Sequence, residues 1–316
     1  MEISAQHITE ARERIKPFIH KTPVLSSKTI NNMIGAELFF KCENFQKIGA
    51  FKIRGGMNAV LTLSKEKLKQ GIATHSSGNH AQAIAYAARE VGTKAYIVMP
   101  DNSPKVKVDA VRGYGAEIFF CEANQAAREK TLQELLDKTG AEMIHPYNDY
   151  RVITGQATCA KEITDEISGL QAIIAPVGGG GLLSGTALSV FYFSPHTLVY
   201  AGEPEGAADA VLSFKSNKIE QAPYIKTIAD GLLTKLGDKT FPIIKKYVKD
   251  ILIVNDDEII AAMRLVYERM KIVIEPSAAV PLAAVLKNKS LFEGKKVALI
   301  FSGGNVDLSK LSGWFI

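Results

Sequence analysis

The sequence has few cysteines and no long apolar run, and these two absences exclude several classes of protein. Its three cysteines, Cys42, Cys121 and Cys159, are scattered and never form a Cys-x-x-Cys pair. This pattern argues against a disulfide framework and a zinc cluster, and it fits a reducing cytoplasm. Apolar runs such as 297–301 are far too short to span a bilayer. The N-terminus lacks a basic region followed by an apolar stretch, so we expect no signal peptide and no membrane partner.

The chain also lacks a concentrated patch of one charge. Its formal net charge is +5, but segments such as 64–70 and 245–250 mix basic residues with acidic or polar ones. No basic stripe alternates with aromatic residues, so we expect no nucleic-acid partner. With 316 residues, of which 47% are hydrophobic, the chain exceeds the usual size of one core, and we expect two lobes.

Strand-like and helix-like segments alternate along most of the chain. Predicted strands cover 71–75, 94–99, 117–121, 143–145, 172–177, 198–202 and 297–301. Predicted helices cover 81–91, 108–114, 125–138, 182–193, 258–270 and 279–286, with Asn255 or Asp256 as the cap of the fifth. Segment 207–240 is less periodic and predicts loops and short helices. Such alternation predicts parallel sheets with helices on both faces, in two α/β lobes.

Lys52 lies between Phe51 and Ile53 in a segment with glycines on both sides. Apolar neighbours can desolvate a lysine amine, which lowers its pKa toward the range where it is a nucleophile. Most lysines are surface residues, however, so this segment alone does not separate a catalytic lysine from a solvated one. The loop 76–80 is equally ambiguous, because N–H groups at a helix start suit an anion, yet Ser76, Ser77 or Asn79 could be an ordinary cap.

Four consecutive glycines, 178–181, follow a predicted buried strand and precede a predicted helix. They favour a phosphate site, because glycine costs stability wherever a close backbone approach is not needed. A Walker loop is excluded by Leu182, and the dinucleotide fingerprint breaks at Leu183 or Ser184, depending on where it starts. Glu203 does end the next predicted strand, where a ribose-binding acid would lie. An NAD-dependent dehydrogenase or a non-catalytic nucleotide-binding module therefore stays an alternative.

A further loop, Ser-Gly-Gly-Asn at 302–305, directly follows the last predicted strand. In open parallel sheets, ligands bind at the carboxyl ends of the strands. Loops 76–80, 178–181 and 302–305 all begin at predicted strand ends. Their convergence predicts one shared ligand site.

In their order along the chain, these loops resemble the serine/threonine dehydratase and serine racemase family of fold-type II pyridoxal phosphate enzymes. The resemblance covers roughly the whole chain and includes the motifs 20–24, 41–44, 229–231, 275–276 and 302–307. It implies a tryptophan synthase β-like α/β fold with two open, twisted parallel-sheet domains. The implied division is a large cofactor-binding domain, 1–64 plus 146–316, and a small mobile domain, 65–145.

The resemblance implies a role for each loop. Lys52 would bind pyridoxal 5'-phosphate as a Schiff base and act as base and acid on one face of the substrate, with Phe51 packed against the ring. Asn79 would bind the ring hydroxyl, and Ser302 the pyridine nitrogen. The phosphate would be held by the N–H groups of Gly178, Gly179, Gly180, Gly181 and Leu182. The substrate carboxylate would be bound by the backbone of Ser76, Ser77, Gly78, Asn79 and His80.

Further positions resemble the racemase-like branch of the family. Ser77 matches that branch's acid/base on the face opposite Lys52. Glu203, the Ala207 carbonyl and Asp209 match a site for a divalent cation, Mg²⁺ or else Ca²⁺ or Mn²⁺. Arg128 and Thr234 fall where related enzymes have substrate-side residues, although Thr234 replaces a serine of the mammalian racemase. The segment 145–148, His-Pro-Tyr-Asn, resembles the bacterial and fungal dehydratases more.

The resemblance implies a pyridoxal phosphate-dependent ammonia-lyase that acts on a small amino acid. It would convert L-threonine to 2-oxobutyrate, and L-serine to pyruvate, releasing ammonia. A neutral Ser302 favours this outcome, because it should leave the pyridine nitrogen largely unprotonated and so favour early loss of a β-hydroxyl. The alternatives are serine racemase and threo-3-hydroxyaspartate dehydratase, with an NAD-dependent dehydrogenase as a distant one.

The resemblance also bears on assembly and regulation. The chain stops soon after the Ser302 loop, so we expect no C-terminal regulatory domain and no feedback by isoleucine. We expect a cytoplasmic homodimer or homotetramer, and a nucleotide effector at a subunit interface is compatible with the resemblance.

Overall fold

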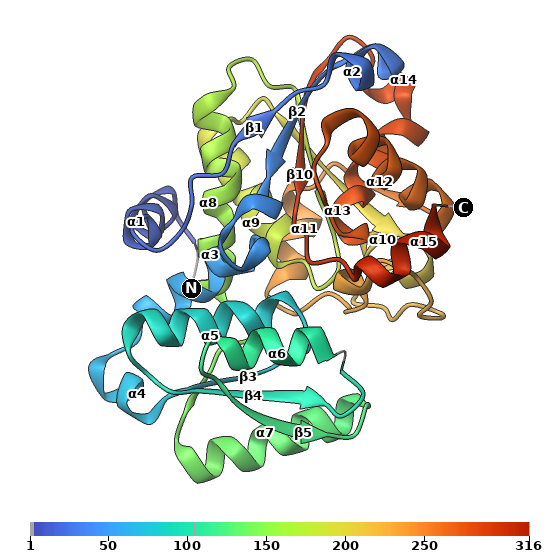
Figure 1. Ribbon diagram of the computed structural model, residues 1–316. Coiled ribbons are helices and arrows are strands. Elements are labelled where there is room, and N and C mark those ends of the chain that lie inside the picture. The colour runs from blue at the N-terminus through green and yellow to red at the C-terminus, as the bar shows by residue number, and fades with distance from the viewer. Residues whose placement is uncertain (1–2, 104, 316) are drawn as a thin grey trace.

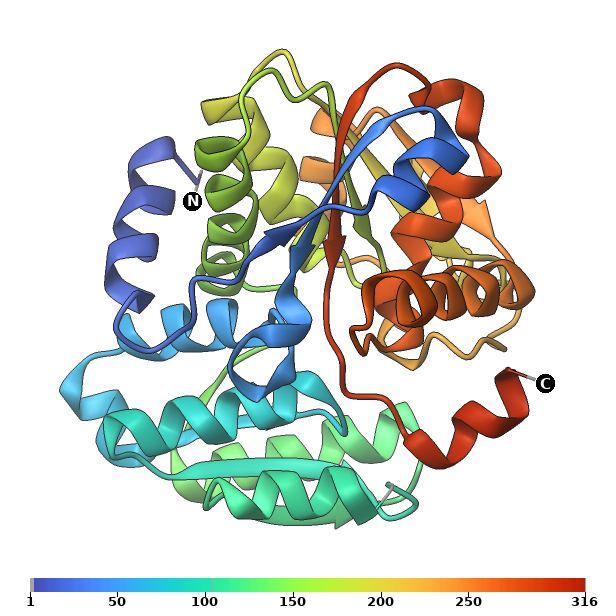
Figure 2. The same cartoon turned by 45° about the horizontal axis from the view of Figure 1, so that its top comes forward.

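The computed structural model describes residues 3–103 and 105–315, which form two α/β bodies, each built on its own sheet (Figures 1 and 2). The larger sheet has the strand order β1-β2-β10-β7-β8-β9, and the smaller has the order β5-β4-β3-β6. All neighbouring strands run parallel except β1, which pairs antiparallel with β2 at the edge. The predicted α/β class with two parallel sheets is confirmed.

The elements have the following bounds. The strands are β1 (Val24–Leu25), β2 (Glu37–Cys42), β3 (Ile72–His75), β4 (Ala95–Pro100), β5 (Glu117–Cys121), β6 (Glu142–Met143), β7 (Ala172–Pro176), β8 (Leu198–Pro204), β9 (Asp250–Val254) and β10 (Lys296–Phe301). The α-helices are α1 (Ala5–Ile15), α2 (Lys28–Ile34), α3 (Lys52–Leu61), α4 (Lys65–Gln70), α5 (Asn79–Val91), α6 (Lys105–Gly113), α7 (Gln125–Thr139), α8 (Tyr150–Glu166), α9 (Gly181–Phe193), α10 (Asp209–Ser216), α11 (Thr240–Tyr247), α12 (Asp256–Met270), α13 (Pro276–Lys287), α14 (Lys289–Phe292) and α15 (Leu311–Trp314). Short 3-10 turns are η1 (Glu43–Phe45), η2 (Lys47–Gly49), η3 (Glu205–Ala207), η4 (Asp230–Leu232) and η5 (Leu308–Lys310).

The central strands of the larger sheet are apolar because both of their faces are covered. In β10, Val297 and Leu299 join a core with α12 and α13, whereas Ala298 and Ile300 join a core with α8 and α9 on the other face. Helices α1, α3, α8 and α9 lie side by side on that second face (Figure 2). This double cover explains why the sequence of β10 shows an unbroken apolar run.

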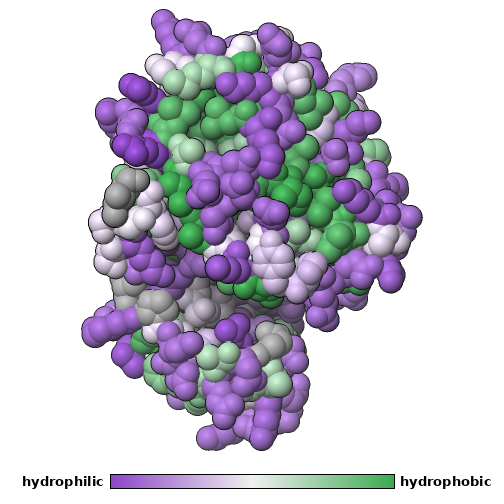
Figure 3. All heavy atoms as spheres, turned by 90° about the vertical axis from the view of Figure 1, so that its right-hand side faces the viewer, coloured by the Kyte–Doolittle hydropathy of each residue, from purple (hydrophilic) through white to green (hydrophobic). Residues whose placement is uncertain are grey.

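The smaller body follows the same plan. Ile72 and Ile97 face a core that includes α5, and Ala73 and Val98 face a second core that includes α7. Its elements run from α4 to β6, and the predicted domain limits and the mobility of this part stay predictions. Figure 3 shows this body below the larger one, with polar side chains over much of the visible face and apolar ones in separate patches. Among the described residues, no helix is both long and apolar enough to cross a membrane.

Several predicted boundaries are confirmed by their capping residues. Helix α7 ends at Gly140, which has the left-handed conformation, and α12 begins after Asn255, whose side chain accepts the N–H of Glu258. Helix α5 begins at Asn79, two residues before the predicted start, and β6 is shorter and earlier than predicted. The segment 207–240 forms short helices and loops as predicted. Helix α8, with 17 residues, and strand β9 were not predicted.

A network of buried charges joins α3 to the larger sheet. The Arg54 guanidinium forms ion pairs with Glu43 at 2.7 Å and with Glu162 at 2.8 Å, and Lys41 pairs with Glu162 at 2.7 Å. The Thr22 hydroxyl donates to the Glu43 carboxylate, and the Thr22 backbone carbonyl accepts from Lys41 Nζ. The positive charges of Arg54 and Lys41 thus balance the negative charges of the two glutamates. This network fixes the start of α3, where Lys52 lies, against β2 and α8.

Candidate active site

The predicted loops meet where the two bodies face each other. Loop 76–80 follows β3, the four glycines follow β7, and loop 302–305 follows β10. The Phe51 N–H donates to the Ser302 carbonyl at 3.0 Å, and Ala50 forms a β-bridge with Gly303. The segment that carries Lys52 therefore lies beside the last of these loops, although about 250 residues separate them along the chain.

Lys52 occupies the first position of α3, and its side chain is half-buried. The Nζ atom donates to the Pro146 carbonyl at 3.0 Å and lies 5.2 Å from the centroid of the Phe51 ring. Burial lowers the pKa of Lys52 to about 8, and the nearby Glu275 carboxylate acts in the opposite direction. An amine with this pKa is partly neutral at physiological pH, which is the state required of a nucleophile or base.

Two histidines near Lys52 are neutral. The Nδ1 atom of His145 accepts the N–H of Asn148 at 2.9 Å, and His80 Nε2 lies 3.0 Å from the Ile144 carbonyl. Burial lowers the pKa of His145 to about 4 and that of His80 well below its usual value, and the charge on Lys52 contributes to both shifts. These rings enclose the amine without competing with it for a proton.

The Asn79 side chain is fixed by two residues that the sequence did not single out for a role. Its Nδ2 donates to the Glu275 carboxylate at 3.0 Å, and its Oδ1 accepts from Asn305 Nδ2 at 2.7 Å. The Asn305 N–H donates to the same carboxylate at 3.1 Å. Burial raises the pKa of Glu275 to about 7. This arrangement sets which end of the Asn79 amide is the donor, because Nδ2 lies 3.0 Å and 3.2 Å from the two oxygens of the Glu275 carboxylate. The motifs 275–276 and 302–307 were the only sequence signal for Glu275 and Asn305.

Each of the four glycines is required by a close neighbour. A Cβ on Gly179 would lie 2.4 Å from the Tyr147 ring, and one on Gly178 would lie 2.9 Å from Leu232 Cα. Gly180 adopts a positive φ of 89°, and a Cβ there would meet Thr240 at 2.9 Å. The loop ends at the first turn of α9, where N–H groups have no intrahelical partner and the helix dipole favours an anion.

The glycine loop and Lys52 are joined through two consecutive residues. The Pro146 carbonyl accepts from Lys52 Nζ, and the next side chain, Tyr147, packs on Gly179 and Gly181. The glycine loop, whose N–H groups suit an anion, is thus linked to the partly neutral Lys52 amine through residues 146–147. These residues fit a cofactor that carries both an aldehyde and a phosphate, as pyridoxal 5'-phosphate does.

The remaining predicted site residues occupy less constrained positions. Ser302 is buried, and the Ser76 hydroxyl accepts the N–H of Gly78 at 3.3 Å. Ser77 lies in the same loop, half-buried, and its side chain makes no hydrogen bond within the described residues. The exposed Thr234 lies near the Tyr147 hydroxyl, and the Tyr147 ring packs on the glycine loop.

Arg128 lies on α7 in the smaller body. Its charge helps to lower the pKa of His75, after burial, so these two side chains are close to each other. The Nε atom of Arg128 is buried and has no hydrogen-bond partner within the described chain. Arg128 therefore lies near His75, the last residue of β3, in the smaller body.

The two acids predicted to bind a cation are both buried at the end of β8 and the start of α10. The Glu203 carboxylate accepts the N–H groups of Ala210 at 2.6 Å and Val211 at 2.9 Å, and Asp209 accepts that of Leu236 at 3.0 Å. Burial raises the pKa of Glu203 to about 8 and that of Asp209 to about 6. No ion pair involves either acid in the described chain, where no cluster of three or more His, Cys, Asp or Glu side chains with metal-binding geometry exists. Carboxylate and carbonyl oxygens are nevertheless the donor types that a hard cation prefers.

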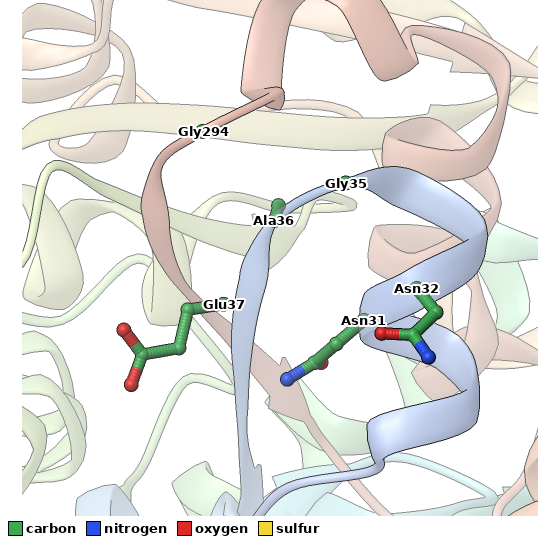
Figure 4. A pocket seen from close by; sticks show the side chains of 6 residues that line it. All are labelled: Asn31, Asn32, Gly35, Ala36, Glu37 and Gly294. Atoms are coloured by element: carbon green, nitrogen blue, oxygen red, sulfur yellow. The ribbon is translucent and has the colours of Figure 1, made fainter.

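A pocket on the larger body lies at the opposite edge of its sheet. Figure 4 shows it lined by Asn31, Asn32, Gly35, Ala36, Glu37 and Gly294. Glu37 is the first residue of β2, so the pocket lies at the amino ends of the strands. The site loops, in contrast, follow the carboxyl ends of the strands. The Asn31 amide is already used, because its Oδ1 accepts the N–H of Leu38 and its Nδ2 donates to Ser26. We assign no function to this pocket.

Comparisons with known proteins agree with this geometry. Residues 15–303 match the family described as pyridoxal-phosphate dependent enzyme. The β-hydroxyaspartate dehydratase of Paracoccus denitrificans (strain Pd 1222) is 50% identical over 301 residues, which cover 95% of this chain and 96% of that protein. The serine racemase of Dictyostelium discoideum is 49% identical over 314 residues, 98% of this chain and 97% of that protein. The solved structure of maize serine racemase has a TM-score of 0.96 at 43% identity, covering 100% of this chain and 97% of that one.

This chain belongs to the pyridoxal phosphate-dependent enzyme family, in its fold-type II class. Its relatives include serine racemases and hydroxyaspartate dehydratases, so the resemblance inferred from the loops is confirmed. The family match leaves no support for the NAD-dependent alternative.

The lowered pKa of Lys52 leads to a first prediction. With a pKa of about 8, roughly one Lys52 amine in ten is neutral at pH 7, and only the neutral amine attacks an aldehyde. The rate at which the apoprotein takes up pyridoxal 5'-phosphate, followed by absorbance, should rise with pH up to about 8 and then level off. A rate that keeps rising toward pH 10.5, as for an ordinary lysine, would show that the amine is not desolvated.

Proposed function

We propose that this protein is an ammonia-lyase that dehydrates small β-hydroxy amino acids, with L-serine and L-threonine as its first candidate substrates. The observation that carries this proposal is the lowered pKa of Lys52, set beside a Ser77 side chain that makes no hydrogen bond within the described residues; the resemblance puts Ser77 on the face opposite Lys52. Racemisation requires a second group that transfers a proton on the other face of the substrate. The Ser77 hydroxyl has no basic hydrogen-bond partner in the described chain to activate it, whereas elimination requires only the base.

The residues of the chain divide the remaining work. When bound, pyridoxal phosphate makes the substrate Cα proton acidic by accepting the electrons left behind. Lys52 Nζ would hold the cofactor and then take that proton. The N–H groups of 178–182 would hold the phosphate, Asn79 Nδ2 the ring hydroxyl, and the neutral Ser302 the ring nitrogen. The substrate loses water as its β-hydroxyl and Cα proton, and it then takes up one water as its nitrogen leaves as ammonia, which gives the 2-oxo acid.

A second candidate substrate is threo-3-hydroxyaspartate. It carries an additional carboxylate, and the buried Arg128 Nε without a partner is a cationic donor able to receive it. The Paracoccus relative, named as a β-hydroxyaspartate dehydratase, supports the same substrate. With this substrate the reaction is still a dehydration. Only the group that the smaller body binds differs, because the substrate has a second carboxylate.

The experiment that tests the proposed function compares L-serine, L-threonine and L-threo-3-hydroxyaspartate as substrates of the purified holoenzyme. We expect 2-oxo acid and ammonia in equal amounts from at least one of them. If L-serine is instead converted mainly to D-serine, as measured by chiral chromatography, the lyase proposal is wrong. Arg128→Met separates the two candidates, because it should lower kcat/KM on hydroxyaspartate at least about tenfold if Arg128 pairs with the second carboxylate, and should affect serine less.

The acid pair supports a proposal about a cation. We infer that Glu203, the Ala207 carbonyl and Asp209 bind a divalent cation, Mg²⁺ or else Ca²⁺ or Mn²⁺, because a cation would stabilise the ionised form of two buried acids that have no ion-pair partner. EDTA should then lower the melting temperature, and Mg²⁺ should restore it. A cation present at 100 times its Kd contributes about 2.7 kcal/mol.

A matched pair of variants makes this prediction specific. Glu203→Gln should abolish the Mg²⁺-dependent rise in melting temperature. Glu205→Gln alters an exposed acid two residues away and should keep the rise in full. Equal responses of the two variants would place the cation elsewhere.

Assembly and location stay predictions. A homodimer or homotetramer can be distinguished by light scattering. A nucleotide effector can be tested by adding ATP to the activity assay, and a cytoplasmic location can be examined by cell fractionation.

A further inference from the structure

The glycine loop is supported from behind by a buried threonine that lies in none of the sequence motifs. Thr240 is fully buried at the first position of α11. Its hydroxyl donates to the Gly179 carbonyl at 2.8 Å and accepts the N–H of Gly237 at 2.9 Å. The Gly237 carbonyl, at 3.2 Å, is the other acceptor within reach, but it already receives the N–H of Phe241 at 2.9 Å. The single hydroxyl proton is therefore best used on Gly179.

This hydrogen bond determines where the next N–H group points. In a planar trans peptide, the carbonyl and the N–H point in opposite directions. When the Gly179 carbonyl is turned toward Thr240, the Gly180 N–H is turned away from it. Gly180 has a positive φ, and Thr240 and Ile244 fill the space where a Cβ would lie, at 2.9 Å and 2.7 Å. The Gly180 N–H is thus directed away from the buried Thr240, and Gly180 immediately precedes α9.

Thr240 is itself held firmly. Its carbonyl accepts from the Ser184 hydroxyl of α9 at 3.2 Å, so the threonine is tied to both the glycine loop and the helix that follows it. The preceding residue, Lys239, donates its N–H to Asn148 Oδ1 at 2.9 Å. The hydroxyl therefore acts from a fixed position.

We propose that Thr240 is a positioning residue for the phosphate of the cofactor. Its hydroxyl fixes the Gly179–Gly180 peptide so that the Gly180 N–H donates to a phosphate oxygen. This inference rests on the proposed binding of the phosphate by the glycine loop. Without the hydroxyl the peptide rotates, and one hydrogen bond to a charged oxygen is weakened or lost. A loss of that kind corresponds to roughly 10- to 100-fold in affinity.

The test compares two cofactor forms on three apoproteins. Thr240→Val keeps the shape of the side chain and removes the hydroxyl, and Thr240→Ser keeps the hydroxyl. Wild type and both variants are titrated with pyridoxal 5'-phosphate and with pyridoxal, which has the same aldehyde and no phosphate. We expect Thr240→Val to lower the affinity for pyridoxal 5'-phosphate by roughly 10- to 100-fold and to leave the affinity for pyridoxal unchanged. Thr240→Ser should bind pyridoxal 5'-phosphate with an affinity within about threefold of that of the wild type.

Other results have distinct meanings. If Thr240→Val binds the phosphate form as wild type does, or loses affinity for both forms equally, Thr240 is not a positioning residue for the phosphate. If the wild-type protein binds pyridoxal 5'-phosphate and pyridoxal with equal affinity, the proposed phosphate site is wrong. This result differs from one in which only the role of Thr240 is wrong. Circular dichroism of the apoproteins checks folding, and Thr240→Ala, which introduces no new methyl beside Gly237, replaces the valine variant under the same expectations if that variant unfolds.

Discussion

Replacing Lys52 with alanine should lower kcat on the best amino-acid substrate by roughly 10³-fold or more, because one amine both holds the cofactor and takes the Cα proton. The effect should fall on chemistry and not on folding. Burial already disfavours the charged form of this amine, as its lowered pKa shows, so removing it relieves an unfavourable burial. The apoprotein melting temperature should stay the same or rise, and 2-oxo acid formation by the reconstituted protein measures the loss.

The control for this variant is Lys69→Ala, which removes an exposed lysine of α4 outside the site. It should retain the turnover of wild type. If Lys52→Ala keeps more than about a tenth of wild-type kcat, the amine contributes less than a positioned base does, and its assigned role is wrong.

The largest loss of stability should come from Arg54→Met. This change removes the cation that pairs with both Glu43 and Glu162, and it leaves the two carboxylates buried with only Lys41 to compensate them. Breaking a buried ion pair by removing one partner costs about 3–5 kcal/mol. The free energy of unfolding of the apoprotein, measured in urea, should fall by this amount.

An exposed ion pair provides the comparison. Arg12 and Asp165 lie 2.7 Å apart, and about a third of each side chain is exposed. Arg12→Met should cost less than about 1 kcal/mol. If Arg54→Met costs no more than Arg12→Met, the buried network does not stabilise the fold, and some other contact fixes the start of α3.

The sequence predicted the sheet architecture well where local pattern and tertiary environment agree. Strand β10 is an apolar run because both of its faces are covered, and α12 carries its own capping residue, Asn255. Helix α8 was missed because small, polar and β-branched residues occupy much of its buried surface, where long aliphatic side chains would mark a helix. It contains β-branched residues and Gly155, where a Cβ would lie 2.4 Å from the Arg54 carbonyl. The glycine that weakens the helical pattern is what allows α3 to pack against it.

The site was only partly predictable for a similar reason. Loops at strand ends can be located from local pattern, and the ordered resemblance then singled out Lys52. The residues that fix the site act across long separations, as when Glu275 binds Asn79 at a separation of 196 residues and Thr240 binds Gly179 at one of 61. No local spacing indicates such pairs. The structure also gives a reason for motifs that had none, because Thr22, Lys41 and Glu43 belong to the buried network beneath α3.

The central claim is that Lys52 carries the cofactor, and borohydride reduction of the holoenzyme followed by peptide mapping tests it most directly. Reduction makes the bond between the lysine nitrogen and the cofactor permanent, so mass spectrometry can locate it. We expect a single phosphopyridoxyl group, on Lys52, and none in Lys52→Ala. A group found on another lysine, or a wild-type protein that takes up no pyridoxal 5'-phosphate, would contradict the account.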